Sequence, residues 1–126
     1  MGAALVLVFI HFVADFLCQT DKMALNKSKS LYWLSMHVLT YTAVLWGGSI
    51  FLFYGYSDLF AVVSAYAGVN GGLHFITDFF TSKLTSKLWQ RESKHWFFVA
   101  IGFDQAIHYS CLFLSYGYLI KFPFDR

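Results

Sequence analysis

The sequence is poor in charged side chains. They make up 13% of its 126 residues, whereas an ordinary soluble domain carries about 25%. One proline and nine glycines exclude a disordered or low-complexity chain. The sequence also lacks a basic run of the kind that binds nucleic acid, so we expect no nucleic-acid partner. A chain of this length is enough for one domain and too short for two of ordinary size.

Apolar side chains are abundant instead. They make up 58% of the sequence, and 21% of all residues are aromatic. A soluble domain of this size would have to bury most of its 15 Phe, 8 Tyr and 4 Trp residues, and it would run short of polar surface. In a bilayer the same side chains can face lipid. The composition therefore predicts an integral membrane protein whose partner is the lipid bilayer.

Four apolar stretches are each close to the ~20 residues that cross about 30 Å of hydrocarbon. They cover residues 2–20, 31–54, 59–82 and 96–122. Because the connections are short, we expect an all-α, antiparallel four-helix bundle that forms a single transmembrane domain, residues 1–126. The first stretch has no basic residues before it and reads as a retained span, not a cleaved signal peptide. The third connection can extend the third span as a helix beyond the membrane.

The basic residues indicate the orientation of the spans. Seven of the nine lie in the first and third connections: Lys22, Lys27, Lys29, Lys83, Lys87, Arg91 and Lys94. The positive-inside rule places these two connections in the cytoplasm. Both termini are then expected on the periplasmic side of a bacterial inner membrane, in a multi-pass protein.

Seven ionisable side chains interrupt the apolar stretches: His11, Asp15, His37, His74, Asp78, Asp104 and His108. Three of the four spans carry a His and an Asp four residues apart, which places the pair on one helical face. Ionisable residues within spans are costly and usually face the bundle interior. Four of the seven, one from each span, lie 8 to 11 residues from the nearest cytoplasmic lysine, within a layer about 5 Å thick. We therefore expect a single cluster.

Such a cluster can serve three chemistries. Imidazole and carboxylate groups together suit zinc, iron or manganese, and bundle cores often hold such ligands. A proton or ion path would also place Asp and His side chains inside the membrane, whereas an interhelical hydrogen-bond network would need no ligand. We favour one or two divalent transition-metal ions, with zinc ahead of iron and manganese. The two isolated cysteines, Cys18 and Cys111, fit small buried side chains better than metal ligands or a disulfide.

The expected roles follow from the spans. The first-choice ligands come from the last two spans, which adjoin through one connection: His74, Asp78, Asp104 and His108. His11 and Asp15 would hold a second metal or act as the acid/base pair, and His37 would complete a shell. Asn70, one turn from His74, is expected to orient a substrate or to hold helices together.

Several neighbouring residues have smaller expected roles. Gln19 and Gln105 border the cluster, and Tyr41 either supports it or packs helices together. His95, at the membrane edge, is expected to lie outside it. Three glycines of the third span fit close packing against a neighbouring helix better than phosphate binding: Gly68, Gly71 and Gly72.

The segments HFVADFLCQTDKMALNKS, HVLTY, NGGLHFITDFFTSK and FDQAIHY resemble a family of small bacterial and phage multi-spanning membrane proteins known as a domain of unknown function. The resemblance covers nearly the whole chain and implies no activity. It implies these signature positions: His11, Asp15, Gln19, His37, Asn70, His74, Asp78, Asp104, Gln105 and His108. The chain is more loosely similar to bacterial inner-membrane proteins described as metal-dependent hydrolases, but it lacks their His-Ser signature.

The function that these observations favour is a metal-dependent hydrolase acting on a membrane-embedded or amphiphilic substrate. A zinc-bound water is acidified to near pH 7, which provides a nucleophile without a catalytic Ser or Cys. The alternative is a proton or metal-ion transporter or channel that uses the same cluster. Four thin spans leave little room for a pore, so a conducting function would favour a homo-oligomer.

Overall fold

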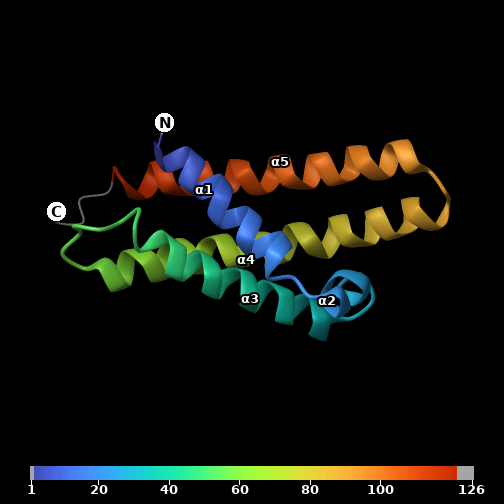
Figure 1. The fold of residues 1–126 in the computed structure, drawn as a ribbon, viewed down its shortest axis with the longest axis horizontal. Coiled ribbons are helices and arrows are strands. Elements are labelled where there is room, and N and C mark those ends of the chain that lie inside the picture. Colours follow the sequence, from blue (N-terminus) through green and yellow to red (C-terminus); the bar gives the residue numbers. More distant parts are fainter. Residues whose placement is uncertain (1, 122–126) are drawn as a thin grey trace.

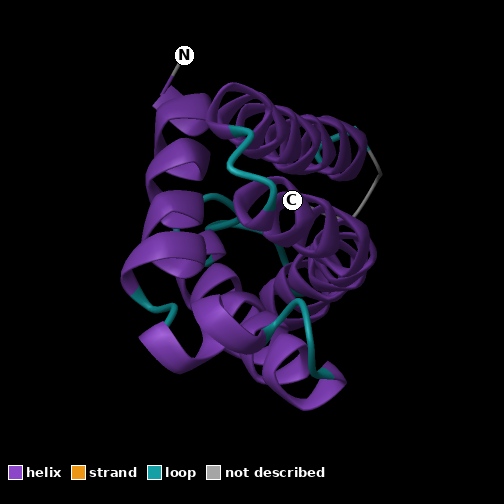
Figure 2. Cartoon of the chain, turned by 90° about the vertical axis from the view of Figure 1, so that its right-hand side faces the viewer, coloured by secondary structure: helices purple, strands orange, loops and turns teal. Residues whose placement is uncertain are grey.

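The computed structural model describes residues 2–121, and within them the chain forms helices and connecting loops but no strand (Figure 2). The all-α prediction is therefore confirmed. The elements in chain order are α1 Gly2–Phe12, the π-helical segment η1 Val13–Leu17, α2 Asp21–Asn26, α3 Leu31–Ser49, α4 Leu59–Gln90 and α5 Lys94–Leu119.

The long helices surround one interior. α1 packs on α3, α3 on α4, α4 on α5, and α5 returns to α1. In Figure 1, α3, α4 and α5 run along the long axis of the molecule, and α1 crosses them obliquely. The short α2 packs on α3, toward the end of the molecule where α4 turns into α5.

The first two predicted spans end differently in the structure. The first helix stops at Leu17, and the polar connection after it forms a helix of its own, α2. Thr20 starts α2 by accepting a hydrogen bond from the Met23 backbone N–H at 3.3 Å. The second predicted span stops at Ser49 instead of residue 54, and the turn that follows includes Gly55, which has a φ of +98°.

The third predicted span continues into the connection, as expected, and α4 ends at Gln90. Asp58 caps its start by accepting a hydrogen bond from the Ala61 backbone N–H at 3.1 Å. Its end is closed by Glu92 in the left-handed conformation, φ 55°, and by a bond from Ser93 N–H to the Leu88 carbonyl at 3.0 Å. α5 begins at Lys94, two residues before the predicted fourth span, whose predicted end at residue 122 lies outside the described residues.

The segment η1 is wound more widely than an α-helix. The Cys18 backbone N–H donates to the Val13 carbonyl at 2.9 Å, five residues back. Such π turns contain one extra residue and are frequent at functional sites, because they change the direction of the side chains that they carry. Here the turn carries Asp15, whose side chain is buried in the interior.

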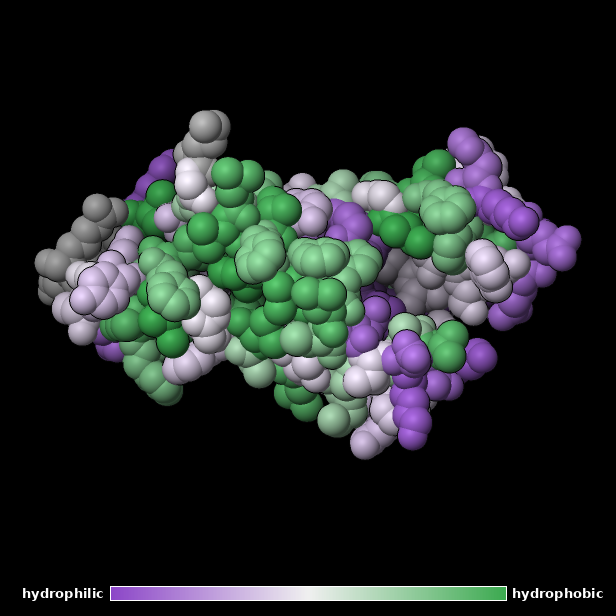
Figure 3. Space-filling model, viewed as in Figure 1, coloured by the Kyte–Doolittle hydropathy of each residue, from purple (hydrophilic) through white to green (hydrophobic). Residues whose placement is uncertain are grey.

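Two helices, α4 and α5, are long and apolar enough to cross a membrane by length and composition, and the helix over Gly2–Leu17 is apolar but shorter. Large apolar side chains on the long helices point outward, with 62% to 74% of each exposed: Phe9, Leu39, Phe60, Phe103 and Leu114. In Figure 3 the hydrophobic surface covers the middle of the molecule, and hydrophilic side chains concentrate toward the end that holds α2 and the α4–α5 turn. An apolar exterior of this extent marks a surface that meets lipid or another protein.

One of the three glycines brings two helices close together. A Cβ at Gly71 of α4 would collide with the Thr42 hydroxyl of α3. A Cβ at Gly68 or Gly72 would have no atom within 4 Å. The prediction of close packing is therefore confirmed for Gly71 and wrong for Gly68 and Gly72, which lie on the exposed face of α4.

Candidate metal centre

The ionisable side chains of the long helices converge on one point of the interior, as their depth along the sequence predicts. Ion-pair and hydrogen-bond distances connect all seven of them: His11, Asp15, His37, His74, Asp78, Asp104 and His108. All are buried except Asp104, which is half-buried. Four helical segments, α1 with η1, α3, α4 and α5, each contribute at least one of these side chains.

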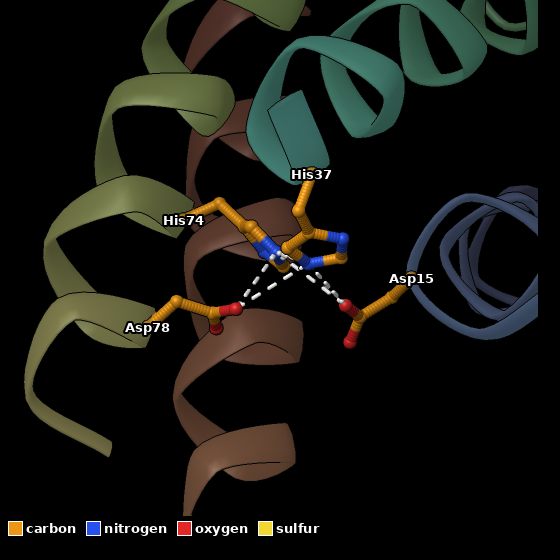
Figure 4. A group of neighbouring side chains, drawn as sticks. All are labelled: Asp15, His37, His74 and Asp78. Atoms are coloured by element: carbon orange, nitrogen blue, oxygen red, sulfur yellow. Dashed lines mark hydrogen bonds and ion pairs between the residues drawn. The ribbon is translucent and has the colours of Figure 1, made fainter. Parts of the chain in front are cut away.

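The centre of the cluster is formed by two imidazoles between two carboxylates (Figure 4). The Nε2 atoms of His37 and His74 face each other at 3.0 Å. Asp15 Oδ1 lies 3.1 Å from His37 Nε2 and 3.4 Å from His74 Nε2. Asp78 Oδ2 lies 3.3 Å and 3.7 Å from the same two nitrogens. Three separate elements, η1, α3 and α4, thus each direct at least one ligand atom at a common centre.

Five of the six distances among these four atoms are close to those of a tetrahedral metal shell. Bonds of 2.0–2.1 Å from a metal to nitrogen or oxygen would place the corners of a tetrahedron about 3.3–3.4 Å apart. The N···N and N···O distances in the cluster range from 3.0 to 3.7 Å, and all four atoms lie within 4.8 Å of one another. The four residues can therefore hold a metal ion with little rearrangement.

A second group shares one carboxylate with the first. Asp15, Asp104 and His108 also offer ligand atoms within 4.8 Å of one another. His108 Nε2 lies 3.4 Å from Asp104 Oδ1 and 3.1 Å from Asp78 Oδ1. The first-choice ligand set is therefore divided, because η1 turns Asp15 into the interior between the two groups. His74 and Asp78 lie with Asp15 in the first group, and Asp104 and His108 lie with it in the second, while the His108–Asp78 contact joins the two.

His11 supports the cluster through Gln105. The Gln105 amide donates from Nε2 to Asp15 Oδ2 at 3.0 Å and to Asp104 Oδ2 at 3.1 Å. Its Oε1 then faces His11 Nε2 at 2.9 Å, so that nitrogen donates, and His11 Nδ1 accepts from the Tyr41 hydroxyl at 3.3 Å. Both polar ends of His11 are engaged, and it lies outside the two groups of ligand atoms.

Lys27 is a member of the cluster that the sequence did not reveal. Its ammonium lies 2.7 Å from Asp78 Oδ2. Sequence reasoning assigned Lys27 only to a basic connection, because no periodicity links that connection to the spans. The sequence signal that was available is Thr20, which caps the start of α2 within the connection, and the packing of α2 on α3 then brings Lys27 to the cluster.

Asn70 lies apart from the cluster. Its amide donates to the Tyr66 carbonyl at 2.9 Å and to the Ser115 hydroxyl at 2.8 Å. Asn70 thus ties α4 to α5, which supports the alternative that it holds helices together rather than the alternative that it orients a substrate.

A cavity of about 210 Å³ opens onto the cluster from the side of α2, and its polar lining consists largely of Asp15, Gln19, Lys27, Asp78, Asp104 and Gln105. The opposite side is closed. The Tyr41 ring stacks on His74 with ring centroids 3.9 Å apart. Beyond it lies a buried apolar core that includes Leu45, Tyr66 and Leu112.

The chain belongs to the family described as "Protein of unknown function (DUF3307)", whose profile matches residues 4–123. Comparisons with curated proteins and with solved structures found no match. The function is therefore inferred from the geometry of the site.

Proposed function

We propose that this protein is a membrane-embedded, metal-dependent hydrolase acting on an amphiphilic or membrane-associated substrate. The observation that carries the proposal is the convergence of four buried residues, Asp15, His37, His74 and Asp78, whose ligand atoms lie within 4.8 Å of one another. Two imidazoles and two carboxylates suit zinc, and they also accept iron or manganese.

A second ion would use the group that Asp15 shares with Asp104 and His108. Sites with two metals about 3.5–4 Å apart commonly share a carboxylate and activate water between them. With a single ion bound, Asp104 would be the carboxylate placed to accept a proton from an attacking water, because it is half-buried and lines the cavity. His11 and Gln105 would then position Asp15. This positioning role takes the place of the acid/base role expected for His11.

Two helices, α4 and α5, have the length and composition of membrane spans. The proposal assigns all four long helical segments to the membrane. The apolar exterior and the concentration of basic residues near α2 and the α4–α5 turn support it. With the positive-inside rule, this end faces the cytoplasm of a bacterial cell and both termini face the periplasm. The cavity then opens at the cytoplasmic side of the inner membrane, where a substrate can reach it from the lipid surface.

Transport of protons or metal ions is the alternative use of the cluster. A path needs access from both sides of the membrane, whereas the cavity opens on one side and the stacked Tyr41 with the core beyond it closes the other. This one-sided access favours a hydrolase. In the alternative, purified protein in liposomes would show a pH-dependent ion flux, which His74→Ala would abolish.

Elemental analysis of detergent-purified protein tests the proposal. We expect one or two transition-metal ions per chain in the wild type and reduced occupancy in His37→Ala and His74→Ala. His95→Ala is the matched control, because His95 lies outside both groups of ligand atoms. Folded wild-type protein that stays metal-free after reconstitution with zinc, iron and manganese would overturn the proposal.

A further inference from the structure

The cavity at the cluster continues into a larger one. The second cavity, of about 490 Å³, shares several of its lining residues with the first: Ala24, Lys27, Ser82, Thr85 and Phe97. The two together form a groove that runs from the cluster, between α2 and α4, toward the start of α5. We call it the α2–α4 groove.

The outer part of the α2–α4 groove has the charge and polarity of an anion site. Lys27 and Lys29 contribute two cations, and no acidic residue lines this part among residues 2–121. Four hydroxyl groups accompany them: Ser28, Ser82, Thr85 and Ser86. Cations and hydroxyls together offer charge-assisted hydrogen bonds to the oxygens of a phosphate group.

Ser82 provides an independent indication of a ligand. Its side chain is buried, with 8% exposed, and its hydroxyl has no hydrogen-bond partner. Helical hydroxyls usually bond to a carbonyl of the preceding turn, as Thr77 and Thr81 of α4 do. A buried hydroxyl without a partner is costly. Because Ser82 lines both cavities, a rotation of its side chain would let the hydroxyl donate to a group held between Lys27 and the cluster.

The rim of the groove is apolar. Leu25 and Trp89 line it with 71% and 59% of their side chains exposed, and Phe97 lies at the junction of the two cavities. An anion with a hydrophobic chain can therefore place its charged group between the lysines and its chain along these side chains.

We propose that the α2–α4 groove binds the phosphate group of an anionic amphiphile, so that the substrate of the metal centre is a phosphate monoester. This inference rests on the proposed hydrolase function. In the reaction, water adds to phosphorus while the bond from phosphorus to the ester oxygen breaks. The proton of the water passes to the departing alkoxide, and the products are an alcohol and inorganic phosphate. Lys27 pairs with Asp78, and a metal ion that shared the charge of that carboxylate would leave the lysine available to the phosphate.

Calorimetric titration of the protein in maltoside micelles tests this inference, with empty micelles as the blank. Hexyl phosphate, inorganic phosphate and hexanol are the probes. We expect hexyl phosphate to bind and Lys27→Gln and Ser82→Ala each to weaken that binding about tenfold. Lys87→Gln removes the same charge from α4 outside the groove and should leave the affinity unchanged.

Each outcome decides one part of the inference. Equal affinity for hexyl phosphate and inorganic phosphate would show that the groove binds free phosphate rather than an amphiphile. Absent binding, or an equal loss in Lys87→Gln, would overturn the groove assignment. Ser82→Ala changes no charge, so it tests the groove even if Lys27→Gln fails to fold. The metal content of each sample separates the two proposals. Metal-loaded protein that does not bind hexyl phosphate refutes only the substrate class, whereas metal-free protein that binds it, and binds it more weakly in Ser82→Ala, refutes only the metal centre.

Discussion

Lys27 and Asp78 form a 2.7 Å ion pair across 51 positions of the sequence. The pair ties the end of α2 to the middle of α4 and closes the first connection over the cluster. The Asp78 side chain is 2% exposed and that of Lys27 is 19% exposed, so both charges are largely removed from water. The lysine therefore supplies a cation to a carboxylate that we assign to a metal ion.

Lys27→Met should destabilise the metal-free protein by about 3 kcal/mol, because it removes the ammonium that pairs with the buried Asp78 carboxylate. Added zinc should restore most of this loss, since the ion replaces the missing charge. Thermal unfolding in detergent, with and without zinc, measures both effects. Lys87→Met is the control for loss of a surface charge. A Lys27→Met protein that is equally destabilised with and without zinc would contradict the assignment.

Asp15→Asn should lower metal occupancy more than Asp104→Asn, because Asp15 belongs to both ligand groups and Asp104 to one. If the wild type holds two ions, Asp104→Asn should retain one and Asp15→Asn neither. If it holds one ion, Asp104→Asn should keep it. Elemental analysis gives these ratios. An equal loss in both variants would show that the two groups do not act separately.

Gly71→Ala should lower the free energy of unfolding by about 1–3 kcal/mol, because its Cβ would press on Thr42 of the neighbouring helix. Thr42 cannot turn aside without breaking the bond from its hydroxyl to the Val38 carbonyl at 2.7 Å. Gly72→Ala, one residue along the same helix, should be neutral or slightly stabilising. Unfolding in detergent measures both. Similar stability of the two variants would mean that α3 and α4 pack less closely at this point.

Reporter fusions test the proposed orientation. Fusions after Lys29 and after Lys87 should report a cytoplasmic location, and a fusion after Arg126 should report a periplasmic one. The physical reason is the retention of basic connections on the cytoplasmic side. A cytoplasmic signal from the fusion after Arg126 would overturn the four-span assignment.

The helices and the membership of the cluster were predictable from the sequence. Apolar stretches of spanning length locate the starts of the long helices to within two residues, and His–Asp pairs four residues apart indicate which side chains share a face. His37 has no Asp four residues away. Its distance from the nearest cytoplasmic lysine nevertheless places it at the same depth as His74. These relations depend on local spacing, which the sequence states directly.

The partners within the cluster were not predictable. An α-helical periodicity cannot show that η1 contains an extra residue, and this residue decides that Asp15 lies between both groups. Lys27 was missed for a related reason, since its contact depends on how α2 folds back. Asn70 shares a helical face with His74, but its side chain donates to Ser115 of another helix, outside the cluster.

The π turn at Val13–Leu17 also makes the first helix sensitive to length. Each α-helical residue rotates the chain by about 100°, so a deletion that converts the turn to regular α-helix would rotate α1 against everything after it. Either Leu7 and His11 or Asp15 would then leave the interior, where all three are now buried. A single-residue deletion between His11 and Asp15 should therefore be far less tolerated than one in the loop around Gly55, and alignments within the family should show no gaps there.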